Sequence, residues 1–447
     1  MTEMAATDGT TPARRVIDVR ASRRALVAGS IGNLVEWYEY SLYGYMAPVI
    51  AELFFPTDDS VAGLLATFSL FALAFFLRPV GAAVFGRFAD RAGRRPVLVL
   101  IITLMSAATA LIGVLPTYAV IGIWAPLLLT VLRVVQGLAA GGEFGGAVSL
   151  MAEYAPPGKR GLYGSWSFFT NVIGFVLGAG MATVLIVVLS ADTLVLWGWR
   201  IGFLMAAPMG LIALYLRIRV DETPSFRAVS NTAITVSAAA ATAKVAAGSG
   251  QSGLVRQVLT TVGVVVIYSC TGYTFMVLMP TYLSKTLGMS LEQSYLLTLI
   301  NGAVAGLVVP FAGAWSDRVG RRTVMLVGTV GTIVLSYPLF LMLRGGFVAA
   351  LAALIVAGIL IGLIGGPLPA LLSERFPTRQ RVTGVSLAYA LSVALFGGTA
   401  PFIITAVVSA TGNSLAAAWY TVACGLITLV TLLVLRRSAA HLEPLRD

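Results

Sequence analysis

The chain has 447 residues, of which 58% are hydrophobic and only 11% charged, and this composition excludes a soluble protein and predicts one that lies in a lipid bilayer. The formal net charge is +11, but 25 of the 30 Lys and Arg residues lie in the two tails and in alternate loops between apolar segments. That distribution follows the positive-inside rule, so the basic charge reports membrane orientation and we expect no nucleic-acid partner.

Twelve apolar segments follow one another, each about 20 residues long, which is the length that crosses ~30 Å of hydrocarbon as a helix. They fall into two groups of six, at 25–218 and 257–436, with an N-tail at 1–24, a linker at 219–256 and a C-tail at 437–447. We therefore expect an all-α, multi-pass protein of the inner (plasma) membrane with two six-helix bundles and both termini in the cytoplasm.

The first apolar segment carries two acidic residues at membrane depth. Glu36 and Glu39 share one helical stripe with Tyr40 and Tyr43, and Asn33 lies one turn earlier. A charge in hydrocarbon costs at least ~2.5 kcal/mol, so such residues normally face a partner or a water-filled cavity. We therefore expect this stripe to face the interior of the protein.

The second and fourth segments supply the basic partners and a third acid. Arg78 precedes Pro79, while Arg133, Gln136 and Glu143 lie along the fourth segment among glycines that permit close helix packing. Three acids then stand against two arginines, so one carboxyl group is left over and can bind a proton reversibly. The candidates for the proton site are Glu39, Glu143 and Glu36, and Arg133 is the candidate for binding a substrate carboxylate. The alternative is that all five charges form structural pairs that lock these helices together.

Other polar residues in the apolar segments could contact a substrate. The complete set of candidate substrate-binding residues is Arg133, Gln136, Tyr40, Tyr43, Asn33, Asn171, Tyr273, Asn301 and Tyr389. The tyrosines could equally serve only to pack helices together.

A charged loop occurs twice in the chain. Gly86–Arg95 and Gly313–Arg322 share the frame G-x-x-x-D-R-x-G-R-R at an offset of 227 residues. We expect the aspartate of each copy to accept hydrogen bonds from the helix that follows it, and the arginines to bridge to acids at neighbouring helix ends. The predicted gating residues are Arg78, Asp90, Arg91, Arg94, Glu153, Asp317, Arg318, Arg321 and Glu374. The alternative is that the arginines only enforce topology.

Catalytic and metal-binding patterns are missing from the sequence. Cys270 and Cys424 lie within apolar segments, and the only histidine, His441, lies in the C-tail. No nucleophile with a base and no metal-ligand cluster is recognisable, so we expect no enzymatic activity, no metal and no cofactor.

At its motifs the chain resembles the major facilitator superfamily, and within it the metabolite:proton symporter family of proline/betaine, α-ketoglutarate, citrate and shikimate permeases. The resemblance rests on the repeated loop and on five segments, at 32–40, 77–81, 133–146, 197–201 and 397–401. It implies two bundles that rock about a central site and uptake driven by protons. Glu39 stands where this family usually has aspartate, so its carboxyl reaches further.

The sequence therefore predicts a symporter that takes up a small carboxylate-bearing metabolite with a proton by alternating access, and that functions as a monomer. The C-tail is short beside the coiled coil of osmosensing members, which favours an organic acid as the substrate. The nearest alternative is a permease for zwitterions such as proline or glycine betaine. A drug/proton antiporter is less favoured, because the fifth segment lacks the G-P-x-x-G-G turn of the superfamily's exporters.

Overall fold

The computed structural model describes residues 19–92, 94–142, 148, 151, 155–156, 158–219, 251–376 and 381–438. Most of the N-tail, the linker and the C-tail therefore lie outside the described residues. The elements of the first half are α1 (Val19–Tyr45), α2 (Ala47–Phe54), α3 (Ser60–Ala92), α4 (Arg94–Val114), α5 (Tyr118–Ile121), α6 (Trp124–Ala139), η1 (Ala140–Gly142), α8 (Arg160–Val188), α9 (Ala191–Thr193), η2 (Leu194–Gly198), α10 (Trp199–Leu204) and α11 (Ala206–Arg219).

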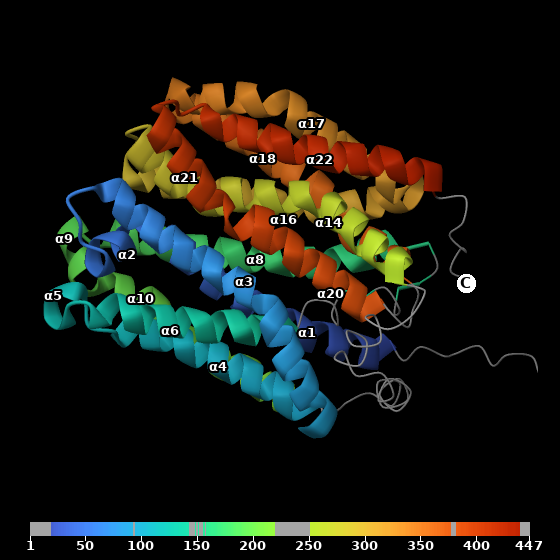
Figure 1. Ribbon diagram of the computed structural model, residues 1–447, viewed down its shortest axis with the longest axis horizontal. Helices are drawn as coiled ribbons and strands as arrows, with labels where there is room; N and C mark the ends of the chain where they lie inside the picture. Colours follow the sequence, from blue (N-terminus) through green and yellow to red (C-terminus); the bar gives the residue numbers. More distant parts are fainter. Residues whose placement is uncertain are drawn as a thin grey trace, which may run out of the picture.

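The second half likewise consists of helices with short connections between them in its described residues. Its elements are α14 (Gln251–Tyr273), η3 (Thr274–Leu278), α15 (Met279–Thr281), η4 (Tyr282–Thr286), α16 (Leu291–Val319), α17 (Arg321–Met342), η5 (Leu343–Gly345), α18 (Phe347–Gly365), α19 (Leu368–Arg375), α20 (Arg381–Ser392), η6 (Val393–Gly398), α21 (Ala400–Thr411) and α22 (Ala416–Ser438). Figure 1 shows the two halves as two layers, the first in blue to green and the second in yellow to red.

Ten helices in the described part of the chain are long and apolar enough to cross a membrane. Two of the twelve expected spans are not among them. One is α1, whose second half carries Asn33, Glu36 and Glu39, and the other is α6, a shorter apolar helix of 16 residues. The all-helical membrane fold is therefore confirmed, whereas the count of twelve spans and the cytoplasmic position of both termini stay predictions.

Close helix packing in the first half depends on glycine, as the glycines of the fourth segment predict. A Cβ atom on Gly137 would lie 2.4 Å from the Ala74 carbonyl oxygen, and one on Gly141 would lie 2.1 Å from the Arg78 carbonyl oxygen. Only a residue without a side chain fits at such distances, so α3 meets α6 and η1 backbone to backbone. This contact holds Arg78 and Arg133 in neighbouring helices of one bundle.

Most contacts between the two halves fall in two seams. In one seam α8 packs along α16, and Figure 1 shows these helices as neighbours between the two layers. In the other seam α3 packs against α20, η6 and α21. The π-helical segment η6 ends at Gly397-Gly398, so the regular α-helix is interrupted there.

Candidate functional site

Arg78 and Glu36 form a buried ion pair between α3 and α1. Their Nη2 and Oε1 atoms lie 2.9 Å apart, and the two residues are only 4% and 5% exposed. The Arg78 guanidinium also lies over the rings of Phe75 and Tyr40, at 4.5 Å and 4.6 Å from their centroids. Pairing and ring contact both offset the cost of burying these charges. Glu36 is therefore paired with an arginine, as the count of buried charges allows.

Glu39, by contrast, is bound by hydroxyl groups. Ser106 donates to its Oε1 at 3.0 Å and Thr109 donates to its Oε2 at 2.8 Å, and both donors lie on α4. Glu39 is 1% exposed, and within the described residues no cation lies at ion-pair distance from it. Its carboxyl group thus faces α4 inside the first half, and it is the buried acid of α1 that has no arginine partner.

A chain of hydrogen bonds runs from Glu39 to Arg133. The Gln136 amide nitrogen donates to Thr109 Oγ1 at 2.6 Å, and Arg133 Nη1 donates to the Gln136 amide oxygen at 2.9 Å. Arg133 and Gln136 lie on α6, Thr109 lies on α4 and Glu39 lies on α1. One polar path therefore connects an acid without an arginine partner to a buried arginine across three helices, and we call it the Glu39–Arg133 chain.

Arg133 retains hydrogen-bonding capacity in this arrangement. It is 1% exposed, and its guanidinium carbon lies 3.1 Å from the centroid of the Tyr43 ring. Its Nε and Nη2 atoms are buried and find no acceptor in the part of the chain that the structure describes. A guanidinium whose Nε–H and Nη2–H groups have no acceptor is suited to bind the two oxygens of a carboxylate.

Aromatic rings from both halves surround the two arginines. Tyr40 packs against Phe75 at a centroid distance of 4.9 Å, and Tyr273 of the second half lies 5.2 Å from Phe75 and 5.9 Å from Phe71. The Tyr273 hydroxyl is buried and finds no partner among the described residues. These contacts make Tyr273 the tyrosine of the second half that lies in the same ring cluster as Tyr40.

The predicted asparagines mainly join helices. Asn33 on α1 donates to the Ser167 carbonyl and to Thr170 Oγ1 on α8, and it also contacts the Asn171 side-chain oxygen. Asn301 donates to the Phe275 carbonyl at 2.8 Å, while its own side-chain oxygen is buried without a donor in the described residues. Tyr389 packs edge-on to Phe168 at a centroid distance of 6.1 Å. A role for these residues in substrate binding stays a prediction.

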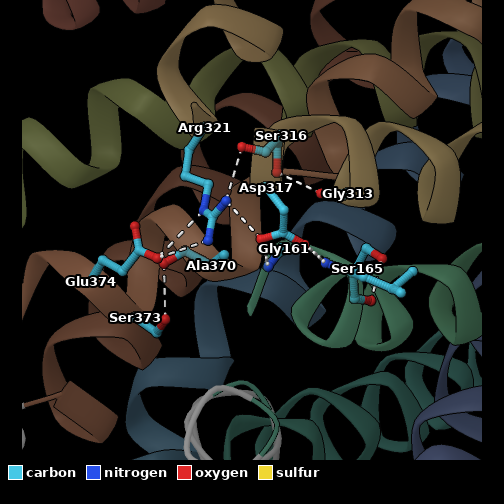
Figure 2. A network of polar contacts seen from close by, with 10 residues as sticks. Gly161, Ser165, Gly313, Ser316, Asp317, Arg321, Ala370, Ser373 and Glu374 are labelled. Carbon is cyan, nitrogen blue, oxygen red and sulfur yellow. Dashed lines mark hydrogen bonds and ion pairs between the residues drawn. The ribbon is translucent and has the colours of Figure 1, made fainter. Parts of the chain in front are cut away.

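Asp317 ties the last turn of α16 to the first turn of α8, which belongs to the other half (Figure 2). Its Oδ1 accepts from the Gly161 N–H at 2.8 Å and its Oδ2 accepts from the Leu162 N–H at 2.9 Å. The sequence-based prediction that Asp317 caps the helix following it is therefore wrong. The N–H groups at the start of any helix lack partners, and here those of α8 lie closest because Gly161 and Gly313 let the two helices touch.

Arg321 completes this contact, which we call the Asp317 network. Its Nη1 atom lies 2.7 Å from Asp317 Oδ1, and its Nη2 atom lies 3.4 Å from Glu374 Oε1. The predicted bridge from the second loop copy to Glu374 is thus confirmed. Arg318 is exposed and makes no ion pair within the described residues.

Several predicted site residues cannot be placed in the same way. Glu143 and Glu153 lie outside the described residues, and so do the side chains of Asp90, Arg91 and Arg94. Their proton-coupling and gating roles stay predictions. Ser106 and Thr109 were not among the sequence candidates, although their spacing of three residues places both hydroxyls on one face of a mostly apolar segment.

A cavity of about 600 Å³ lies between the two halves, at the end of the molecule opposite the Asp317 network. Its walls come from α2 and α3 on one side and from α15, η4 and α21 on the other. We call it the outer cavity, since the sequence predicts that this end faces the outside. Two helical halves that meet in a polar contact at one end and enclose a cavity at the other define a membrane transporter of the two-bundle type.

Comparison with known proteins gives the family. The family described as "Sugar (and other) transporter" matches residues 25–252, and the "Major Facilitator Superfamily" matches residues 261–446. The chain therefore belongs to the major facilitator superfamily and is a multi-pass protein of the inner membrane, which confirms the resemblance seen in its motifs.

Relatives and solved structures agree with this family. The chain is 33% identical over 427 residues to the proline/betaine transporter of Escherichia coli K12, covering 95% of this chain and 85% of the relative. It is 34% identical over 443 residues to the citrate-proton symporter of Klebsiella pneumoniae, covering 98% and 97%. The crystal structure of a D-xylose-proton symporter matches with a TM-score of 0.72 at 19% identity, over 94% of this chain and 98% of that chain, and this likeness supports the fold alone.

Proposed function

We propose that this protein is a symporter that takes up a small carboxylate-bearing metabolite together with a proton, by alternating access. Relatives over nearly the whole chain include a proline/betaine transporter and a citrate-proton symporter, whose named substrates all carry a carboxylate. Both termini would be cytoplasmic, the Asp317 network would lie on the cytoplasmic side, and the protein would function as a monomer.

The observation that carries the proposal is the Glu39–Arg133 chain. Glu39 is a buried acid without an arginine partner, so it is the group in α1 that can gain and lose a proton during transport. The Nε–H and Nη2–H groups of Arg133 have no acceptor within the described residues, so Arg133 is the group that can bind the substrate carboxylate. The Glu39–Arg133 chain would connect these two sites, so that occupancy of one alters the other, as coupled transport requires.

Thr109 provides the step that couples them. While Glu39 is ionised, the Thr109 hydroxyl donates its hydrogen to Glu39 and accepts a hydrogen bond from Gln136. When Glu39 takes up a proton, its new O–H needs an acceptor, and Thr109 can accept it by turning its own hydrogen to the Met105 carbonyl oxygen at 3.0 Å. The Thr109 oxygen then accepts from both Gln136 and the new Glu39 O–H. This weakens its bond to Gln136 and so alters the position of the Gln136 side-chain oxygen that accepts from Arg133.

Occupancy of both sites would favour the state in which the Asp317 network is open. The network spans the two halves through Gly161 and Asp317, so the halves cannot separate at this end while it is intact. Its opening, together with closure of the outer cavity, would expose the bound substrate to the cytoplasm.

A zwitterion such as proline or glycine betaine is the second candidate for the substrate. The observation that favours it is the 33% identity to proline/betaine transporters over 95% of this chain. Arg133 would still bind the carboxylate, and an acid or an aromatic ring would contact the cationic group. An organic acid and a zwitterion differ only in this second contact.

Transport by purified protein in proteoliposomes tests the proposal. We expect uptake to be stimulated by an inward proton gradient, and Glu39→Gln to abolish this stimulation while exchange of internal for external substrate continues. Arg133→Ala should abolish both activities. Glu292→Gln, an exposed acid on α16, is the matched control and should behave as the wild type. Unchanged gradient-driven uptake in both site variants would contradict these roles.

A further inference from the structure

The outer cavity has one wall from each half of the molecule. Its lining includes Glu52 at the end of α2 in the first half, and Thr281 and Lys285 in the α15–η4 region of the second half. Its volume of about 600 Å³ lies in the range of ~300–1,000 Å³ that is usual for small-molecule sites. The cavity can therefore hold a small metabolite with some of its water.

The wall from the second half presents donors for a carboxylate. Lys285 is exposed and makes no ion pair with any described residue. Thr281, four residues earlier, is only 3% exposed, and its hydroxyl oxygen is buried without a hydrogen-bond partner in the described residues. An ammonium group and an unpartnered hydroxyl at one wall form a site for an anionic oxygen.

The wall from the first half presents the opposite charge. Glu52 is exposed, lines the same cavity, and likewise makes no ion pair within the described ranges. Glu52 and Lys285 give the lining one negative and one positive charge, and these stand on different halves. A ligand that bridges the cavity would thus meet the Glu52 carboxylate at one end, and the Lys285 ammonium and the Thr281 hydroxyl at the other.

We propose that the outer cavity is a binding site where a small zwitterion, with a carboxylate and a cationic nitrogen, is held before it reaches Arg133. The carboxylate binds Lys285 and Thr281, and the cationic nitrogen binds Glu52. This inference rests on the proposed symport and narrows its substrate class, because a polyanion such as citrate gains from Lys285 but is repelled by Glu52.

The charge placement also gives the site a role in the transport cycle. A ligand held between Glu52 and Lys285 connects the two halves at the end where the outer cavity lies between them. Binding therefore favours approach of the two walls, which is the movement that must accompany separation at the Asp317 network. The site thus selects the substrate and biases the conformation at the same time.

Uptake kinetics in proteoliposomes, measured with labelled glycine betaine, proline and citrate, test this assignment. We expect Lys285→Gln and Glu52→Gln each to raise the KM for the zwitterion about threefold to tenfold with little change in kcat, since exposed charge pairs contribute modestly. Lys285→Arg, which keeps the charge, should restore the wild-type KM. Glu292→Gln and Arg344→Gln, exposed charges near the same end outside the cavity lining, are the controls.

Each other outcome has a distinct meaning. If the wild type takes up citrate with protons but neither zwitterion, the assignment is overturned and the proposed symport stands. If the two variants match the controls, or change kcat and leave KM unaltered, the binding site is likewise overturned, and the second pattern points to a simple ion-pair gate. If the wild type shows no proton-driven uptake of any of the three, the proposed symport falls as well.

Discussion

Thr109 on α4 contacts Glu39 and Gln136 at the same time, donating to the first at 2.8 Å and accepting from the second at 2.6 Å. A single hydroxyl therefore stands between the candidate proton site and the residue that holds Arg133.

The first prediction is that Thr109→Val uncouples substrate affinity from pH. Valine keeps the size of threonine but neither donates to Glu39 nor accepts from Gln136. A hydrogen bond to a charged group contributes roughly 1.5–3 kcal/mol, so we expect the initial rate of uptake to fall about tenfold or more. The KM of the variant should also vary less with pH than that of the wild type, as measured in proteoliposomes across a pH series.

Thr103→Val is the matched control for this change. Thr103 lies on the same helix, is exposed, and donates only to the Val99 carbonyl at 2.9 Å. It should keep the wild-type rate and pH dependence. Equal behaviour of Thr109→Val and Thr103→Val would remove Thr109 from the coupling scheme.

The second prediction concerns the geometry of Arg133. Arg133→Lys keeps the positive charge but loses the planar fork that can bind two carboxylate oxygens at once. Because Nε and Nη2 are the nitrogens without acceptors, we expect the KM to rise on the order of tenfold to a hundredfold. Uptake measured over a range of substrate concentrations gives this KM directly, and an unaltered KM would show that charge alone suffices or that Arg133 does not touch the substrate.

The third prediction separates Glu36 from Glu39. Glu36→Gln removes the ion partner of Arg78 at a site where both residues are almost fully buried. Leaving one buried charge unpaired costs about 3–5 kcal/mol, so the melting temperature in detergent should fall clearly. The double variant Glu36→Gln/Arg78→Gln should lose less stability than the sum of the two single variants. Strict additivity in this double-mutant cycle would mean that the pair contributes no stability.

The fourth prediction is that Asp317→Asn opens the end of the molecule at which α8 meets α16. Asparagine has one side-chain oxygen in place of two, so at least one of the bonds to Gly161 and Leu162 is lost, and the attraction to Arg321 falls. A cysteine introduced at the buried Ser165 should then react with a water-soluble thiol reagent about tenfold faster or more. Cys270 and Cys424 are buried and would be replaced by alanine in the test protein.

Arg318→Gln is the control for this experiment. Arg318 follows Asp317 directly, is exposed, and makes no ion pair in the described part of the chain. Labelling of Ser165→Cys should be as slow in this variant as in the parent protein. A similar increase in both variants would mean that charge near this helix end, and not the bond to α8, controls opening.

Much of the fold and part of the site followed from sequence reasoning, because burial of charge is costly enough to leave a clear pattern. The pairing of Arg78 with one acid of α1 follows from that cost, and the bridge from Arg321 to Glu374 follows from charge at neighbouring helix ends. The glycines of the fourth segment likewise indicated close helix packing, because a Cβ atom at Gly137 or Gly141 would clash with the backbone of α3.

Other contacts could not be inferred because their chemistry leaves little trace in a sequence. Ser106 and Thr109 are common in apolar helices, where a hydroxyl usually donates to its own helix backbone, so nothing marked them as partners of Glu39. The partners of Asp317 are backbone N–H groups, which every residue except proline has. Which helix supplies them depends on how the two halves dock and not on any residue type.

The same contact has a consequence for the tolerance of the chain to mutation. The Asp317 carboxylate accepts hydrogen bonds from the backbone N–H groups of Gly161 and Leu162, and any change at Leu162 except to proline leaves its N–H in place. Only Gly161 is restricted there, because an added Cβ would lie 2.4 Å from the Gly313 carbonyl oxygen. In a library of all single variants, substitutions that weaken this junction should thus cluster at Gly161 and at 313–321, while Leu162 accepts varied side chains other than proline.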